Sequence, residues 1–136
     1  MVLQKETTYG KITIAERVFA EILLSILEEE EFKDRIWAAN KRGRIIQKGA
    51  AFAENDIASM LHVERGEDER LILNLAAVVK FGESIKATAS KLSDRMAELI
   101  KKHDGRKPKR ITIEVTGVKG ATLQKRSMEI VREYED

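Results

Sequence analysis

Hydrophobic and polar positions alternate in several short stretches of the chain, and this pattern predicts β-strands. The first stretch is YGKITI at residues 9–14, and another is RITIEVTGV at residues 110–118. Two further runs, 59–65 and 70–81, flank the turn GEDE, so we expect them to form a β-hairpin. Both alternating faces of the run 70–81 are largely apolar. This run is therefore predicted to be a central strand, covered on at least part of each side.

Elsewhere the apolar positions recur three and four residues apart, which predicts helices. The first helix is expected to begin near residues 13–16 and to end in the acidic run 28–31, because four like charges oppose the helix dipole there. A second helix is expected to begin after Ser84, an N-cap residue type, and to end within 103–108, which contain a glycine and the only proline. Residues 121–135 are predicted to form a third helix. Its apolar stripe consists of Leu123, Ser127, Ile130, Val131 and Tyr134.

Residues 32–58 carry the weakest pattern. Residues 32–43 fit a short amphipathic helix, with Ile36 and Trp37 facing inward and Gly43 ending it. The following residues fit either a helical turn or an irregular segment. The resulting element order is βα, an insertion, ββαβ and a C-terminal helix at about 120–135. We therefore expect one α+β domain over residues 1–136, with an antiparallel or mixed sheet and helices packed mainly on one face.

Composition narrows the classes of function. The 136 residues are 43% hydrophobic and 35% charged, which is typical of one globular domain with a charged surface. With no cysteine there is no disulfide framework, thiolate chemistry or zinc ribbon. We find neither a secretory signal pattern nor an apolar run of the roughly 18 residues that cross a bilayer. The net charge of +2 hides a basic excess between residues 84 and 110.

One corner resembles the loops that bind phosphates or present nucleophiles, namely Gly82-Glu83-Ser84 after an apolar run. A phosphate-binding loop needs more glycines and a Lys-Ser/Thr pair, and a serine nucleophile needs a base and an oriented acid. Because neither accompanies this corner, we interpret Gly82 as permitting the bend and Ser84 as capping the helix. His62 and His103 are interpreted as structural or surface residues. We expect no catalytic residue, no metal, no cofactor and no small-molecule substrate.

The basic segment supplies an alternative function, nucleic-acid binding. Its candidate contact residues are Lys101, Lys102, Arg106, Lys107, Lys109 and Arg110. The sequence GVKG at residues 117–120 also mimics the GxxG loop of KH domains. Against this alternative, the predicted strands 71–79 and 111–118 contain no aromatic residue on which bases could stack. In addition, GVKG follows a strand, whereas the KH loop joins two helices.

Together, three segments resemble the alkaline shock protein family, known mainly from Gram-positive bacteria. They are YGKITI leading into AERVFAEI, then LILNLAAVVKFGESI at residues 71–85, and ITIEVTGV at 111–118. The family-like unit covers about residues 10–118. The resemblance implies a non-enzymatic, cytoplasmic stress protein with a role in cell-envelope homeostasis. In some members of the family a membrane-embedded partner recruits the protein to the membrane, and the resemblance implies no cofactor and no catalytic residues.

The predicted C-terminal helix lies outside this family-like unit, so its apolar stripe must be covered by the chain's own sheet or by a second subunit. We favour self-association, which makes the protein a homo-oligomer that also binds a protein partner. The residues expected to mediate self-association are Leu123, Ile130, Val131 and Tyr134.

Overall fold

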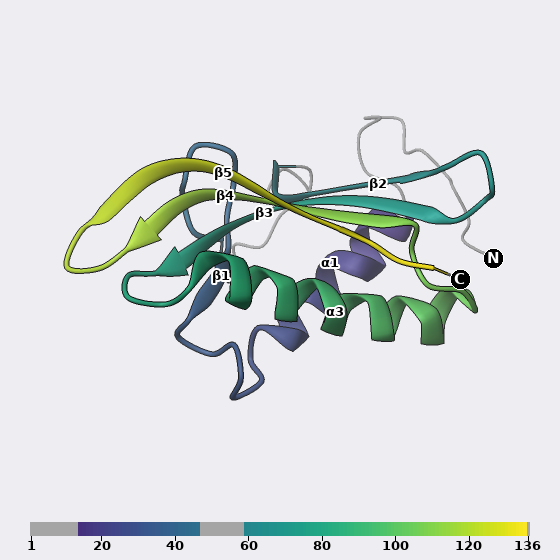
Figure 1. Cartoon of the computed structure of the whole chain (residues 1–136), viewed down its shortest axis with the longest axis horizontal. Coiled ribbons are helices and arrows are strands. Elements are labelled where there is room, and N and C mark those ends of the chain that lie inside the picture. Colours follow the sequence, from purple (N-terminus) through teal and green to yellow (C-terminus); the bar gives the residue numbers. More distant parts are fainter. Residues whose placement is uncertain (1–13, 47–58, 136) are drawn as a thin grey trace.

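A computed structural model describes residues 14–46 and 59–135 (Figure 1). In these residues two helices lie on one face of a five-stranded sheet. The elements in chain order are α1 (Ile14–Ile26), β1 (Ile36–Ala38), β2 (Leu61–Arg65), β3 (Leu71–Lys80), α3 (Ile85–Asp104), β4 (Arg110–Lys119) and β5 (Leu123–Glu133). The predicted strand 9–14 lies outside the described residues except for Ile14, which opens α1. Residues 47–58, the second part of the insertion, also lie outside them.

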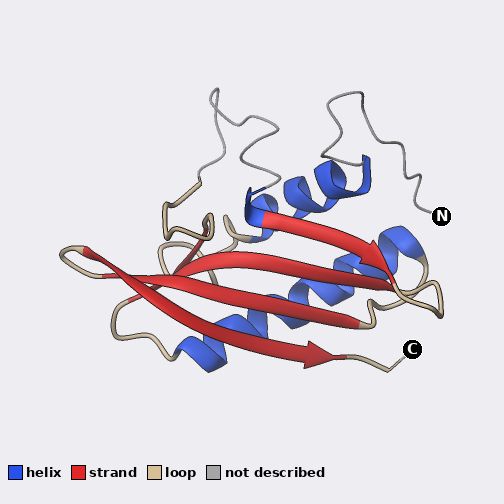
Figure 2. Cartoon of the chain, turned by 90° about the horizontal axis from the view of Figure 1, so that it is seen from above, coloured by secondary structure: helices blue, strands red, loops and turns tan. Residues whose placement is uncertain are grey.

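The sheet is mixed, and β3 lies at its centre (Figure 2). Along one side of β3, both β1 and β2 pair with it in antiparallel fashion. On its other side β3 pairs in parallel with β4, and β4 pairs in antiparallel fashion with β5. Because parallel neighbours need a crossover connection, α3 joins β3 to β4 across the face of the sheet. The predicted α+β class, the 59–81 hairpin and the central position of β3 are confirmed.

The main core lies between the sheet and the helices. Alternate residues of β3, such as Leu73 and Leu75, face the helices, as do Ile111, Ile113 and Val115 of β4. These three β4 side chains are fully buried. From the other side, α3 contributes a buried stripe at helical spacing, which includes Ala89, Leu92, Met96 and Ile100. We call the opposite side of the sheet, which neither α1 nor α3 covers, the open face.

The corner between β3 and α3 is a helix cap, as predicted. Ser84 accepts a hydrogen bond from the backbone N–H of Ala87 at 3.2 Å, so it is the N-cap of α3. Gly82 has a φ of 93°, in the left-handed region where glycine carries no steric penalty. At the other end, Gly105 is the C-cap with a φ of 86°.

The predicted helix at residues 32–43 is wrong. Ile36–Ala38 form strand β1, in which Ile36 pairs with Val79 of β3. The chain then reverses, and the side chain of Asn40 accepts hydrogen bonds from the backbone N–H groups of Arg42 and Arg44 at 2.9 and 3.0 Å. Gly43 belongs to this turn and does not end a helix. The backbone groups of β3 beyond the end of β2 need partners, and β1 supplies them.

The predicted C-terminal helix is also wrong, because residues 123–133 form strand β5. The chain turns at Gly120 and returns along β4, with Ile113 opposite Ile130. The expected apolar stripe is split between the two faces of the sheet. Ile130 and Tyr134 pack against the core, whereas Leu123 and Val131 remain 45% and 50% exposed.

Candidate interaction surfaces

The six basic residues singled out from the sequence run from the end of α3 through the following loop into β4. Lys101 and Lys102 are exposed on the last turn of α3. Further along, the backbone N–H of Lys109 donates to the carbonyl of Leu71 at 2.7 Å, and Arg106 donates to the carbonyl of Asp68 at 3.0 Å. The middle of the segment therefore joins the loop to the β2–β3 hairpin.

This basic segment lies against the acidic β2–β3 turn at residues 66–69. Arg65 and Asp104 form an ion pair at 2.9 Å, and Arg106 bonds to the turn itself. Residues of both charge signs therefore meet at this end of the sheet. The GVKG segment is equally unlike a KH loop, because Gly117 is buried in β4, and a Cβ on it would come within 3.1 Å of the carbonyl of Gln124. The nucleic-acid alternative gains no support from either feature.

Arg70 connects several segments at this end of the molecule. The sequence analysis did not identify it as an important residue. The residue is only 8% exposed. Its guanidinium donates to the carbonyl of Pro108 at 3.0 Å and to the carbonyl of Tyr134. One buried cation thus ties the start of β3 to the loop before β4 and to the end of β5. A single arginine before an apolar run gives no sequence signal for this role.

Glu16 is a second residue that sequence reasoning missed. It belongs to the first turn of α1 and is 4% exposed. Its carboxylate accepts a hydrogen bond from the backbone N–H of Val63 and lies 3.2 Å from Nδ1 of His62. These two partners lie on β2, which forms one edge of the sheet. Glu16 therefore joins α1 to that edge.

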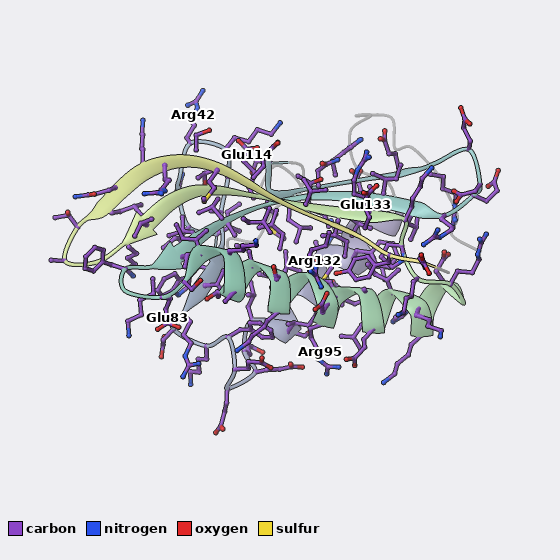
Figure 3. All side chains as sticks on the ribbon, viewed as in Figure 1. Arg42, Glu83, Arg95, Glu114, Arg132 and Glu133 are labelled. Carbon is purple, nitrogen blue, oxygen red and sulfur yellow. The ribbon has the colours of Figure 1, made fainter. Side chains whose placement is uncertain are left out.

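Tyr134 joins the end of β5 to α3. Its hydroxyl lies 2.6 Å from Oγ of Ser93 and donates to the carboxylate of Asp94 at 2.8 Å. Burial is the main reason that the pKa of Tyr134 is raised to about 12, and the bond to Asp94 raises it further, although the bond to Ser93 acts in the opposite direction. Arg132, two residues earlier, also reaches toward α3 and bonds to Asp94 at 3.1 Å (Figure 3).

The open face carries a pocket of about 280 Å³, lined by both polar and apolar residues. Figure 3 shows Arg42 and Glu114 on this side of the sheet, opposite Glu83 and Arg95 on the helix side. The polar side chains that line the pocket include Lys41, His62, Asn74, Thr112, Glu114 and Glu129. Across residues 14–46 and 59–135, no group of three or more histidine or carboxylate side chains is placed to hold a metal ion.

Lys119, the last residue of β4, contacts residues from three other segments: β1, the end of β3 and β5. The ammonium of Lys119 lies 4.9 Å from the ring centroid of Trp37, a cation–π contact. The backbone N–H of Phe81 donates to the Lys119 carbonyl at 2.7 Å, and Leu123 pairs directly with Lys119. Phe81 is 73% exposed, the highest value among the large hydrophobic residues described. We call Trp37, Phe81, Lys119 and Leu123 the hairpin-end surface.

Residues 4–120 match the model of the alkaline shock protein family, which is described as having a cell envelope-related function. The chain belongs to this family. The match confirms the resemblance seen in the three sequence segments. No curated protein and no solved structure matched the chain.

The region that matches the family contains some of the candidate surfaces and excludes others. It includes Trp37, Phe81 and Lys119 of the hairpin-end surface and the whole basic segment, and it ends before β5 begins. No helix in the described part of this alkaline shock family chain is long and apolar enough to cross a membrane.

Proposed function

We propose that this alkaline shock family chain is a non-enzymatic protein-interaction module in a cell-envelope process, and that it contacts a protein partner through the hairpin-end surface. The observation that carries the proposal is the 73% exposure of Phe81. A phenyl ring held in water brings no stability to the fold, whereas aromatic side chains dominate the binding energy of protein interfaces.

The backbone around Phe81 is fixed before any partner arrives. Its N–H is bonded to Lys119, and a Cβ added to Gly120 would lie 3.2 Å from the Cβ of Phe81. The following residue, Gly82, sets the direction of the corner with its positive φ. A preformed anchor loses little conformational entropy on binding, which favours affinity.

The nature of the partner is inferred from the family. The alkaline shock resemblance favours a membrane-embedded protein that recruits a cytoplasmic chain to the membrane during envelope stress. A positive residue, Lys119, and two aromatic residues suit a partner segment that presents apolar side chains beside a carboxylate. The description of the family names no reaction, which supports a non-enzymatic role.

The test compares the wild-type chain with the Phe81→Ser variant in quantitative pull-downs from native cell membranes, followed by titration of the purified partner. Loss of a central aromatic anchor should weaken binding about thirtyfold. Met128→Ser is the matched control, because Met128 is also an exposed apolar residue but lies outside the hairpin-end surface. Equal binding by the wild type and Phe81→Ser would contradict the proposal, provided that both melt at the same temperature.

A further inference from the structure

Strand β5 forms a long free edge of the sheet. It spans 11 residues, and ten of them are exposed. Within the described residues the sheet order ends at β5, and Figure 2 shows no strand beyond it. A free edge presents a row of unpaired N–H and C=O groups, which is a template for pairing with another strand.

The direction of those groups follows from one hydrogen bond. The N–H of Tyr134 donates to the carbonyl of Lys109, so Tyr134 faces β4. Because backbone direction alternates along a strand, Glu133, Val131 and Glu129 direct their N–H and C=O groups away from β4. The pairing of β4 with β5 shifts by one residue between Val115 and Gly117, but beyond this shift the carbonyl of Gln124 still lies against Gly117 of β4. Leu123, Lys125 and Ser127 therefore also belong to the outward set. The side chains of these odd-numbered residues lie on the open face, where Leu123 approaches Val78 and Gly117.

We propose that β5 pairs in antiparallel fashion with β5 of a second copy, about a two-fold axis at Ser127. In this register Lys125 lies opposite Glu129 of the second copy, and Leu123 lies opposite Val131 of the second copy. By symmetry each pair occurs twice. The register therefore matches opposite charges and covers two of the exposed apolar side chains, Leu123 and Val131.

Neighbouring registers do not combine opposite-charge pairs with apolar pairs in this way. Moving the axis by one residue places Lys125 opposite Val131, or Glu129 opposite Leu123. Moving it by two residues places Lys125 or Glu129 opposite its own copy, which is an unfavourable like-charge pair. With Glu129 on the axis, Lys125 still meets Glu133 of the second copy, but Val131 then lies opposite Ser127 and loses its apolar partner. Charge and apolar pattern thus select one register, in which about ten backbone hydrogen bonds form between the copies.

The opposite edge of the sheet explains why this pairing closes as a dimer. The N–H of Gly66 donates to the carbonyl of Arg70, so by alternation Val63 faces away from β3. That outward N–H already donates to the buried carboxylate of Glu16. The two-fold pairing makes the contact isologous, and because Glu16 occupies the middle of the β2 edge, this pairing leads to a dimer and not to a fibre.

The proposal does not rest on the proposed function: Leu123 belongs to both surfaces, but Phe81 takes no part in the pairing of the two β5 strands. Sedimentation equilibrium at low salt should give the wild-type chain twice its mass of 15.4 kDa at micromolar concentration. Lys125→Glu and Glu129→Lys should each weaken dimerisation about tenfold or more, because each creates two like-charge pairs. The double variant should return to within about threefold of the wild type, because the opposite charges are restored.

Glu133→Lys is the matched control. It reverses a charge on the same strand and face, but in this register residue 133 lies opposite Ala121 of the second copy, in the turn. It should leave dimerisation unchanged. A monomeric wild type, a double variant that stays as weak as the single variants, or a Glu133→Lys effect equal to that of Glu129→Lys would overturn the proposal. Phe81→Ser should dimerise normally, which separates this result from that of the pull-down.

Discussion

The two edges of this sheet differ in how their outward backbone groups are satisfied. The β2 edge is only five residues long, and the outward N–H of Val63 is covered by the carboxylate of Glu16 from α1. The β5 edge spans 11 residues and carries three exposed large apolar side chains, Leu123, Met128 and Val131. The fold protects one edge with its own helix and leaves the other open. This difference supports the proposed pairing of β5 with a second copy, since an unprotected edge otherwise promotes aggregation.

The largest expected effect comes from exposing the β2 edge. Glu16→Ala should lower the free energy of unfolding by about 2–3 kcal/mol, because a charged acceptor is removed and the N–H of Val63 loses its partner. Urea denaturation measures this loss. Glu21→Ala is the control on the exposed side of α1 and should change stability by less than about 0.5 kcal/mol. Equal midpoints for Glu16→Ala and Glu21→Ala would show that the β2 edge needs no cover.

A smaller effect is expected where β5 is fastened to α3. Tyr134→Phe removes the hydroxyl that bonds to Asp94 and Ser93, so it should lower the free energy of unfolding by about 1–2 kcal/mol. Dimerisation should persist, because Tyr134 faces the helices and not the outer edge. If Tyr134→Phe were monomeric, the dimer would depend on the contact of β5 with α3 and not on the outer edge of β5.

The pH dependence of stability tests whether the pKa of Tyr134 is raised in the folded chain. Its pKa is raised from 10.0 to about 12, so the folded chain holds this proton more tightly than the unfolded chain. The resulting stabilisation is complete below about pH 10 and is lost as the pH rises toward 12. Denaturation curves recorded across this window should show a fall for the wild type that is smaller in Tyr134→Phe. Parallel curves for the two proteins would contradict the assignment.

The smallest effect concerns the corner away from both edges. Ser84→Ala should cost about 1 kcal/mol through the lost N-cap, and Ser84→Asp should be nearly neutral because aspartate also caps. Neither change should alter the mass of the assembly. A Ser84 variant that dissociates the dimer would show that edge pairing depends on overall stability and not on β5.

The sequence predicted the elements whose signals are local. The helix α3 has a cap at each end and a regular apolar stripe, and the 59–81 hairpin has an acidic glycine turn between two alternating runs. The segment 121–135 was misread because its apolar residues fit a helical stripe as well as a strand. Pairing with β4 decided between the two, and such pairing depends on residues elsewhere in the chain.

The interaction surfaces could be predicted only in part. The sequence shows that residues 101–110 are rich in Lys and Arg. Their contact with the acidic turn depends on how the hairpin and the α3–β4 loop meet, and the sequence does not show this. Glu16 and Val63 are 47 residues apart, and Arg70 and Tyr134 are 64 apart. No spacing rule links such residues, because the fold alone brings them together. Of the four residues predicted to mediate self-association, Leu123 and Val131 are exposed on β5, whereas Ile130 and Tyr134 pack against the core.

The most direct test of the open β5 edge is a single cysteine at Ser127, in a chain that contains no other cysteine. Antiparallel pairing about this residue places the two Cα atoms about 5.5 Å apart, a distance that a disulfide spans. Oxidised Ser127→Cys should therefore form a covalent dimer at micromolar concentration, whereas Glu133→Cys, on the same face of the same strand, should remain monomeric on a non-reducing gel. A Ser127→Cys protein that stays monomeric, or a Glu133→Cys protein that cross-links as readily, would contradict the account.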